Sequence, residues 1–112
     1  MKILPEALSE LMALRETTQT ELAAATGLTD ATVSYYLKGE RGKEMSPQVL
    51  DTLGRFSVAL DVPMDYWLEY RLWRVQQLGL QYPDLVDEIY DLLLDHAATE
   101  DEAQSKRESR RT

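Results

Sequence analysis

The stretch from Thr18 to Gly39 restricts the fold of this chain more than any other. Thr18 and Glu21 have the spacing of a capping box, in which each side chain accepts a backbone N–H at the start of a helix. Gly27 can adopt a positive φ and so allows a sharp turn, and Thr29 can cap a second short helix that ends at Gly39. The stretch therefore predicts two short helices joined by a tight turn.

Apolar residues at helical spacing predict four further helices. One runs from Pro5 to about Glu16 and one from Pro47 to about Leu60, and each has a proline at its first helical position. Two more are expected from Pro63 to about Leu80 and from Asp84 to about His96. The helix that begins at Pro63 is apolar nearly all round, which is typical of a helix buried on two faces. We therefore expect an all-α chain.

Composition limits the classes of protein to be considered. The chain has 112 residues and no cysteine, which excludes disulfides and thiolate metal sites and suits a reducing compartment. The N-terminus is too short for a signal peptide, and no apolar run approaches about 18 residues, so we expect a cytoplasmic protein without a membrane span. His96 is the one histidine, and it lies outside any cluster. We expect no enzymatic activity, no metal and no cofactor.

The net charge of −8 is unevenly distributed along the chain. Residues 61–96 carry eight anions and only two cations, whereas residues 41–60 carry three cations and two anions. Most of the acid therefore lies away from the stretch between Thr18 and Gly39. A polyanionic partner for that stretch is compatible with this distribution, since local charge matters more than the sum.

Two helices joined by a short glycine turn form a helix-turn-helix arrangement. The second helix of such a pair can enter the DNA major groove, which is about 12 Å wide, only if its outer face is not bulky throughout. Asp30, Ala31 and Ser34 are short, and Tyr35 is the one long side chain on that face. The first helix points its N-terminus, with Thr18 and Gln19, at a phosphate.

The segment TQTELAAATGLTDATVSYYLKGER resembles the helix-turn-helix of the Cro/C1-type (XRE) transcriptional regulators. The residues that match the pattern of that family are Thr18, Gln19, Leu22, Ala23, Gly27, Leu28, Thr29, Val33, Ser34 and Gly39. The phrase ALDVPMDYWL is similar to the entry of the family into its fifth helix. The resemblance implies a five-helix lambda-repressor-like domain with a C-terminal helical extension, and double-stranded DNA as the partner.

The resemblance also implies roles for individual residues. Reading of bases is expected from Asp30, Ala31, Ser34 and Tyr35, and an aspartate in this place can accept a hydrogen bond from cytosine N4. Contacts to the DNA backbone are expected from Thr18, Gln19, Thr29, Thr32, Lys38, Arg41 and Lys43. Tyr36, on the opposite side of the same helix, is expected in the core.

Three segments are expected along the chain. Residues 1–62 should form the DNA-binding domain, and residues 63–96 a helical dimerisation extension. Residues 97–112 contain almost nothing to bury and should form a disordered tail. The expected interface between two copies comprises Tyr66, Trp67, Tyr70, Trp73, Leu85 and Ile89. Such a homodimer would place two recognition helices roughly 34 Å apart on a pseudo-palindromic operator, most simply as a repressor.

A second interpretation stays open at this point. The net charge of −8 and the scarcity of cations favour a protein-interaction module that keeps the fold without binding DNA, such as an antitoxin-like or phage adaptor protein. Its acidic helices would bind a basic protein partner. The aromatic cluster of Trp67, Tyr70 and Trp73 could also form a ligand cage, although a core or a subunit interface explains it better.

Overall fold

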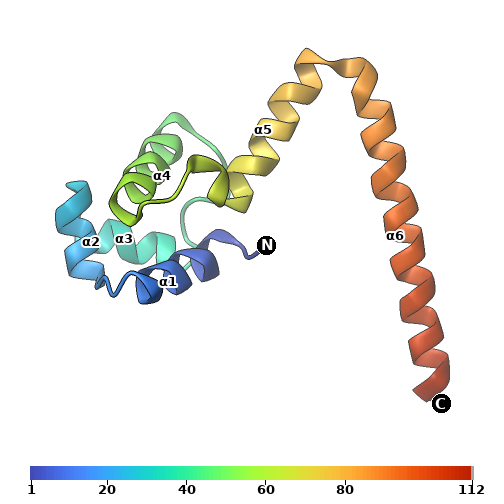
Figure 1. Cartoon of the computed structure of the whole chain (residues 1–112), viewed down its shortest axis with the longest axis horizontal. Coiled ribbons are helices and arrows are strands. Elements are labelled where there is room, and N and C mark those ends of the chain that lie inside the picture. The colour runs from blue at the N-terminus through green and yellow to red at the C-terminus, as the bar shows by residue number, and fades with distance from the viewer. Residues whose placement is uncertain (112) are drawn as a thin grey trace. The chain divides into compact units, whose positions relative to one another are not determined.

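The computed structural model describes residues 1–111, and the side chains of residues 1–107. The elements are α1 (Leu4–Leu14), α2 (Gln19–Thr26), α3 (Asp30–Leu37), α4 (Pro47–Leu60), the short 3-10 helix η1 (Met64–Tyr66), α5 (Leu68–Gln81) and α6 (Pro83–Arg111) (Figure 1). The described residues contain no strand, so the predicted all-α class is confirmed. The chain forms two compact units, of which the first is Met1–Val75 and the second begins at Gln76.

The helix starts follow the capping signals of the sequence. The Thr18 hydroxyl accepts a hydrogen bond from the Glu21 N–H at 3.1 Å, and the Glu21 carboxylate accepts one from the Thr18 N–H at 3.2 Å. Gly27 has a φ of 73°, in the left-handed region that glycine adopts without strain. The hydroxyl of Thr29 accepts the Thr32 N–H at 3.1 Å at the start of α3. The predicted pair of short helices with a glycine turn is therefore confirmed.

The core of the first unit lies between α1, α2, α3 and α4. α3 contacts both α1 and α2, and α2 also contacts α4. The buried apolar side chains are Leu4, Ala7, Leu8, Leu11, Met12, Leu22, Ala23, Val33, Tyr36, Leu53, Phe56, Leu60 and Trp67. Tyr36 packs edge-on against Phe56, with ring centroids 5.4 Å apart, in the arrangement that aromatic pairs prefer. The prediction that Tyr36 belongs to the core is confirmed.

Trp67 also lies in this core, and the prediction that it forms part of a dimer interface is wrong. Its side chain is 0% exposed, and its indole Nε1–H donates a hydrogen bond to the Ser57 hydroxyl at 2.9 Å. The helix expected from Pro63 onward is interrupted, because the backbone of Trp67 is extended between η1 and α5. This break turns the indole inward. The first unit consequently runs to Val75, beyond the domain boundary expected at residues 62 and 63.

α6 is longer than the sequence analysis predicted. It continues to Arg111, whereas an end near His96 and a disordered tail were expected. Residues 97–107 are rich in Ala, Glu, Gln, Lys and Arg, which have high helix propensity. The His96 ring lies 3.9 Å from the Glu100 carboxylate one turn on. The low apolar content of this segment indicates an absence of packing partners, and it does not by itself exclude a helix.

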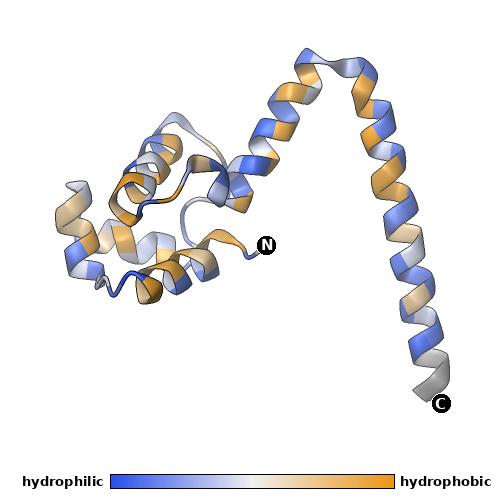
Figure 2. Cartoon of the chain, in the orientation of Figure 1, coloured by the Kyte–Doolittle hydropathy of each residue, from blue (hydrophilic) through white to orange (hydrophobic). Residues whose placement is uncertain are grey.

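The second unit buries few of its own apolar side chains. Ten large apolar side chains of this unit are between 40% and 77% exposed: Leu78, Leu80, Tyr82, Leu85, Val86, Ile89, Tyr90, Leu92, Leu93 and Leu94. Figure 2 shows hydrophobic residues recurring along the first half of α6. α5 has no buried residue. The burial on two faces that the sequence predicted for this helix therefore does not occur within a single chain. No helix in the described part of the chain is long and apolar enough to cross a membrane.

Replacement of Trp67 by Phe should lower the free energy of unfolding by about 1–3 kcal/mol, since it removes the Ser57 hydrogen bond and leaves a void. The measurement is urea unfolding of the full chain, followed by circular dichroism. Trp73→Phe is the matched control, because Trp73 is only half-buried and its ring is tilted by 41° against that of Tyr70, with the centroids 5.8 Å apart. Equal losses for the two variants, at equal protein concentration, would contradict the assignment of Trp67 to the core.

Candidate nucleic-acid interface

α3 presents one exposed face and one buried face. Val33 and Tyr36 are 0% and 1% exposed and fix the helix to the core. Asp30 and Ala31 are exposed, Ser34 is half-buried, and Tyr35 is 37% exposed. The structure therefore places the four residues expected to read bases on the accessible side of α3, with the aromatic side chain at its carboxyl-terminal half.

Gln19 links the two helices of the motif. Its side-chain Nε2 donates a hydrogen bond to the backbone carbonyl of Asp30 at 2.9 Å. The Thr20 hydroxyl lies 3.5 Å from the Asp30 carboxylate, at the limit of a hydrogen bond. Gln19 thus ties the first turn of α2 to the first turn of α3. This positioning contact was not predicted from the sequence, because no local pattern relates residues that belong to different helices.

The start of α2 is partly occupied by its own capping groups. The Thr18 hydroxyl accepts the Glu21 N–H, and the Glu21 carboxylate returns to the Thr18 N–H. A carboxylate therefore already complements the positive end of this helix. At the start of α3, the hydroxyls of Thr29 and Thr32 lie 2.9 Å apart and are hydrogen-bonded. The expected phosphate contacts of Thr18, Thr29 and Thr32 stay predictions, and each hydroxyl has a structural partner.

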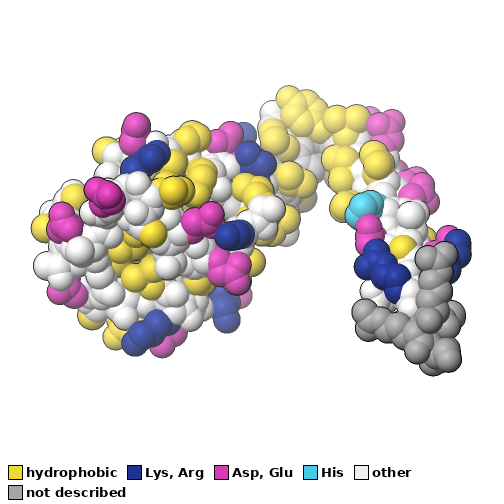
Figure 3. Space-filling model, turned by 60° about the horizontal axis from the view of Figure 1, so that its bottom comes forward, with side chains coloured by type: hydrophobic (Ala, Val, Ile, Leu, Met, Phe, Trp, Pro, Cys, Tyr) yellow, Lys and Arg dark blue, Asp and Glu magenta, His cyan; other side chains and the backbone are white. Residues whose placement is uncertain are grey.

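Three cations follow α3 on the segment that leads to α4. Lys38, Arg41 and Lys43 are exposed, and none of them forms an ion pair with the described residues. The Arg41 guanidinium lies over the Tyr35 ring, 4.5 Å from its centroid, which is a cation–π contact. On the face of the molecule in Figure 3, acidic and basic side chains are interspersed over the first unit. The cation–π contact therefore joins Tyr35, which is expected to read bases, to Arg41, which is expected to contact the DNA backbone.

Two glycines hold this basic segment against the start of α1. Gly39 and Gly42 have φ values of 77° and 95°. A Cβ atom on Gly42 would lie 2.5 Å from Leu4 Cδ2 and 3.2 Å from the Tyr36 ring, and a Cβ on Gly39 would lie 3.3 Å from Pro5 Cγ. The backbone approaches the core too closely for a side chain at Gly42. The positions of Arg41 and Lys43 consequently depend on packing within the core.

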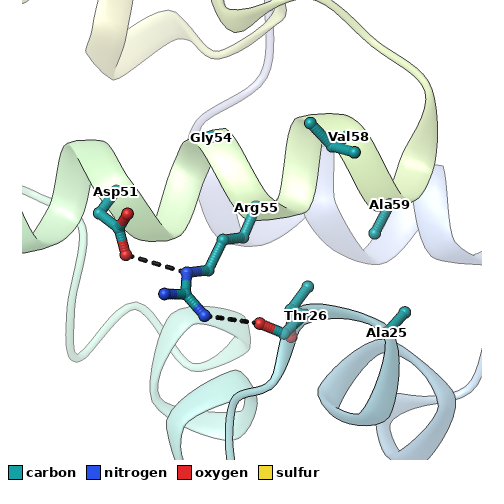
Figure 4. A pocket seen from close by; sticks show the side chains of 7 residues that line it. All are labelled: Ala25, Thr26, Asp51, Gly54, Arg55, Val58 and Ala59. Carbon is teal, nitrogen blue, oxygen red and sulfur yellow. Dashed lines mark hydrogen bonds and ion pairs between the residues drawn. The ribbon is translucent and has the colours of Figure 1, made fainter.

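Arg55 fixes the other end of α2 and was not singled out from the sequence. Its Nη1 donates to the Thr26 carbonyl at 2.8 Å, and its Nε donates to the Asp51 carboxylate at 3.0 Å (Figure 4). An open groove of about 490 Å³ lies beside this contact, and small residues such as Ala25, Gly54 and Ala59 line it. Arg55 satisfies a carbonyl that the last turn of α2 leaves free. Helix α2 is thus tied to α3 at its start and to α4 at its end.

Two short helices, a glycine turn and an exposed α3 face flanked by cations define a helix-turn-helix DNA-binding domain. A family model described as the Cro/C1-type HTH DNA-binding domain matches residues 7–63, just over half of the chain, and the protein belongs to this family. The resemblance noted in the sequence is confirmed. No curated protein and no solved structure matches the chain. The family supports a DNA-binding regulator as the general class of function.

Gly42→Ala should lower the free energy of unfolding by about 1–3 kcal/mol, because the new methyl group clashes with Leu4 and φ is positive there. Gly54→Ala is the opposite control, since nothing lies within 4 Å of its Cβ position inside α4. That variant should raise stability by about 0.5–1 kcal/mol. Urea unfolding of both full-length variants measures the difference, and effects of the same sign would be inconsistent with the packing described.

Proposed function

We propose that this protein is a homodimeric, sequence-specific transcriptional regulator that acts in the cytoplasm as a repressor. The observation that carries the proposal is the exposed face of α3, held to α2 by Gln19 and flanked by cations without ion-pair partners among the described residues. A dimer bound to its operator excludes other proteins from that site, which is the simplest route from binding to regulation.

Each proposed contact follows from the chemistry of the side chain. The Asp30 carboxylate can accept from cytosine N4, and the Ser34 hydroxyl can donate or accept at a base edge. Tyr35 reaches further than its neighbours, and the Arg41 guanidinium lies over its ring. Lys38, Arg41 and Lys43 would neutralise phosphates. Gln19 would contribute chiefly by setting the angle between α2 and α3, with its phosphate contact as a second role.

The proposed dimer rests on the second unit. Leu85 and Ile89 are 51% and 42% exposed and share one side of α6 with Val86 and Leu93. The carboxylates of Asp84, Asp87, Glu88, Asp91 and Asp95 fall on the opposite side. Two copies could therefore pair through their apolar stripes without bringing these carboxylates together. Tyr66, Tyr70 and Trp73 are half-buried within the first unit and stay in the proposed interface.

The test of the proposed function is in vitro selection of bound duplexes by the full chain. The selected sequences should form a pseudo-palindrome whose half-sites are about one helical turn, roughly 34 Å, apart. Tyr35→Ala should change the preferred bases, because it removes the long side chain from the α3 face. Lys43→Gln should weaken all sequences alike and reduce the salt dependence of binding by about one unit of slope.

The matched control for the lysine variant is Arg74→Gln. Arg74 is exposed on α5 and lies outside the candidate interface, so its loss should leave the affinity for DNA unchanged. An unchanged base preference for Tyr35→Ala would remove Tyr35 from the base-reading set. Selection that returns only random sequences would contradict sequence-specific binding.

The dimer has its own test. The full chain should sediment as a dimer at micromolar concentration, and Ile89→Asp should convert it to a monomer, because a carboxylate would enter the apolar stripe. Val58→Asp is the matched control, since Val58 is 85% exposed on α4 in the first unit. Circular dichroism checks that both variants keep their helices. A monomeric parent chain, or equal dissociation of the two variants, would exclude this interface.

A second candidate function is a protein-interaction module with little affinity for DNA. The observation that favours it is the negative charge of the second unit. Residues 76–112 contain nine acidic and four basic residues. A basic partner protein would then dock on that unit. A mobility-shift assay with random duplex at low salt separates the two candidates, since the absence of a shift at tens of micromolar protein favours the module.

A further inference from the structure

A hollow of about 460 Å³ lies in the first unit where α1, α5 and the segment after α3 meet. Ile3, Leu4 and Pro5 form an apolar wall at the start of α1. Gly39 and Gly42 complete the wall through their backbone. The functions proposed above assign no occupant to this hollow.

One wall of the hollow carries carboxylates. Glu69, on α5, accepts a hydrogen bond from the Leu4 N–H through Oε2 at 2.8 Å. Its other oxygen, Oε1, is buried and has no hydrogen-bond partner. Glu6, in the first turn of α1, also lines the hollow. A buried carboxylate oxygen without a donor leaves the Glu69 charge poorly compensated, so a cationic group in the hollow beside Glu69 would stabilise it.

The facing segment carries the cations. Lys38, Arg41 and Lys43 all line the hollow, and none is ion-paired within the described residues. The hollow thus has positive charge on one element and negative charge on two others. A simple anion is attracted by the three basic side chains and repelled by the two carboxylates, and for a simple cation the two effects are reversed. A molecule that carries both charges can place each charged group beside the wall of opposite sign.

We propose that this hollow binds a small zwitterion, a molecule that carries a phosphate or carboxylate group and an ammonium group a few bonds apart. The anionic group contacts Lys38, Arg41 and Lys43, and the ammonium group lies beside the carboxylates of Glu6 and Glu69. The carbon chain between them packs on Leu4 and Pro5. Charge-assisted hydrogen bonds of this kind are the stronger class in proteins.

Such a ligand would also regulate binding of DNA. The three cations that hold its anionic group are the residues expected to contact phosphates, so ligand and DNA compete for them. This regulatory part rests on the function proposed above, whereas binding of the ligand itself does not. By linkage, a ligand that binds only the DNA-free protein must weaken the apparent affinity for DNA.

The test uses O-phosphoethanolamine, which carries a phosphate and an ammonium group, as the probe. Titration of the ¹⁵N-labelled full chain should give saturable chemical-shift changes at the amides of Leu4, Gly42 and Glu69. Inorganic phosphate and ethanolamine, the two halves of the probe, should each bind at least about tenfold more weakly, because each leaves one wall of the hollow unpaired. Equal binding of phosphate and the probe would mean an adventitious ion only and would overturn the proposal.

Variants test the contributions of the acidic and the basic wall separately. Glu69→Gln retains an oxygen for the Leu4 N–H and removes the charge, so it should abolish the preference for the probe over inorganic phosphate. Lys43→Gln should weaken both phosphate-containing molecules, and Arg74→Gln, outside the hollow, should weaken neither. Undiminished selectivity in Glu69→Gln would overturn the proposal, provided that its spectrum shows the parent fold.

Competition with DNA is measured separately. Saturating probe should weaken binding of duplex by the parent chain more than by Glu69→Gln at equal ionic strength. Saturable binding of the probe with no effect on DNA affinity would overturn the regulatory part alone. A chain that binds the probe but no duplex at all would contradict the proposed function and leave the zwitterion site standing.

Discussion

Burial of Tyr36 is the constraint on which the rest of the first unit depends. The side chain is 1% exposed, packs edge-on against Phe56 of α4, and lies directly beneath Gly42. One aromatic ring therefore fixes α3 to α4 and determines how closely the basic segment can approach. With Tyr36 and Val33 turned inward, the 100° step between helical residues leaves Asp30, Ala31, Ser34 and Tyr35 on the other side. The exposed face of α3 is a consequence of the buried one.

The two units differ in how they meet the requirement to bury apolar surface. The first unit encloses Trp67, Phe56 and a set of leucines at 0–2% exposure. The second leaves most of its apolar side chains more than 40% exposed, although their spacing is that of an amphipathic helix. Helices of this kind derive most of their stability from packing rather than from propensity. The second unit thus has the composition of half an interface, which is why the proposed regulator is a dimer.

The sequence was informative where a structural feature depends on residues three or four positions apart. The capping box of α2, the glycine turn and the apolar stripes of α1 and α4 all belong to this group. It was misleading at Trp67, where helical spacing predicted a residue of a continuous helix at the interface between two copies, whereas the indole lies in the core of its own chain. It was misleading again after His96, because low apolar content was interpreted as disorder although the residues favour a helix.

The sequence by itself determined the family, the helix-turn-helix and the residues available on the face of α3, because local propensity and helical periodicity suffice for these. Only the tertiary structure decided how those residues are held. The Gln19 contact to the Asp30 carbonyl, the Arg41 guanidinium over Tyr35 and the Glu69 hydrogen bond to the start of α1 join different elements. Such contacts depend on the distance between helices in space, and helical spacing along one segment contains no record of it.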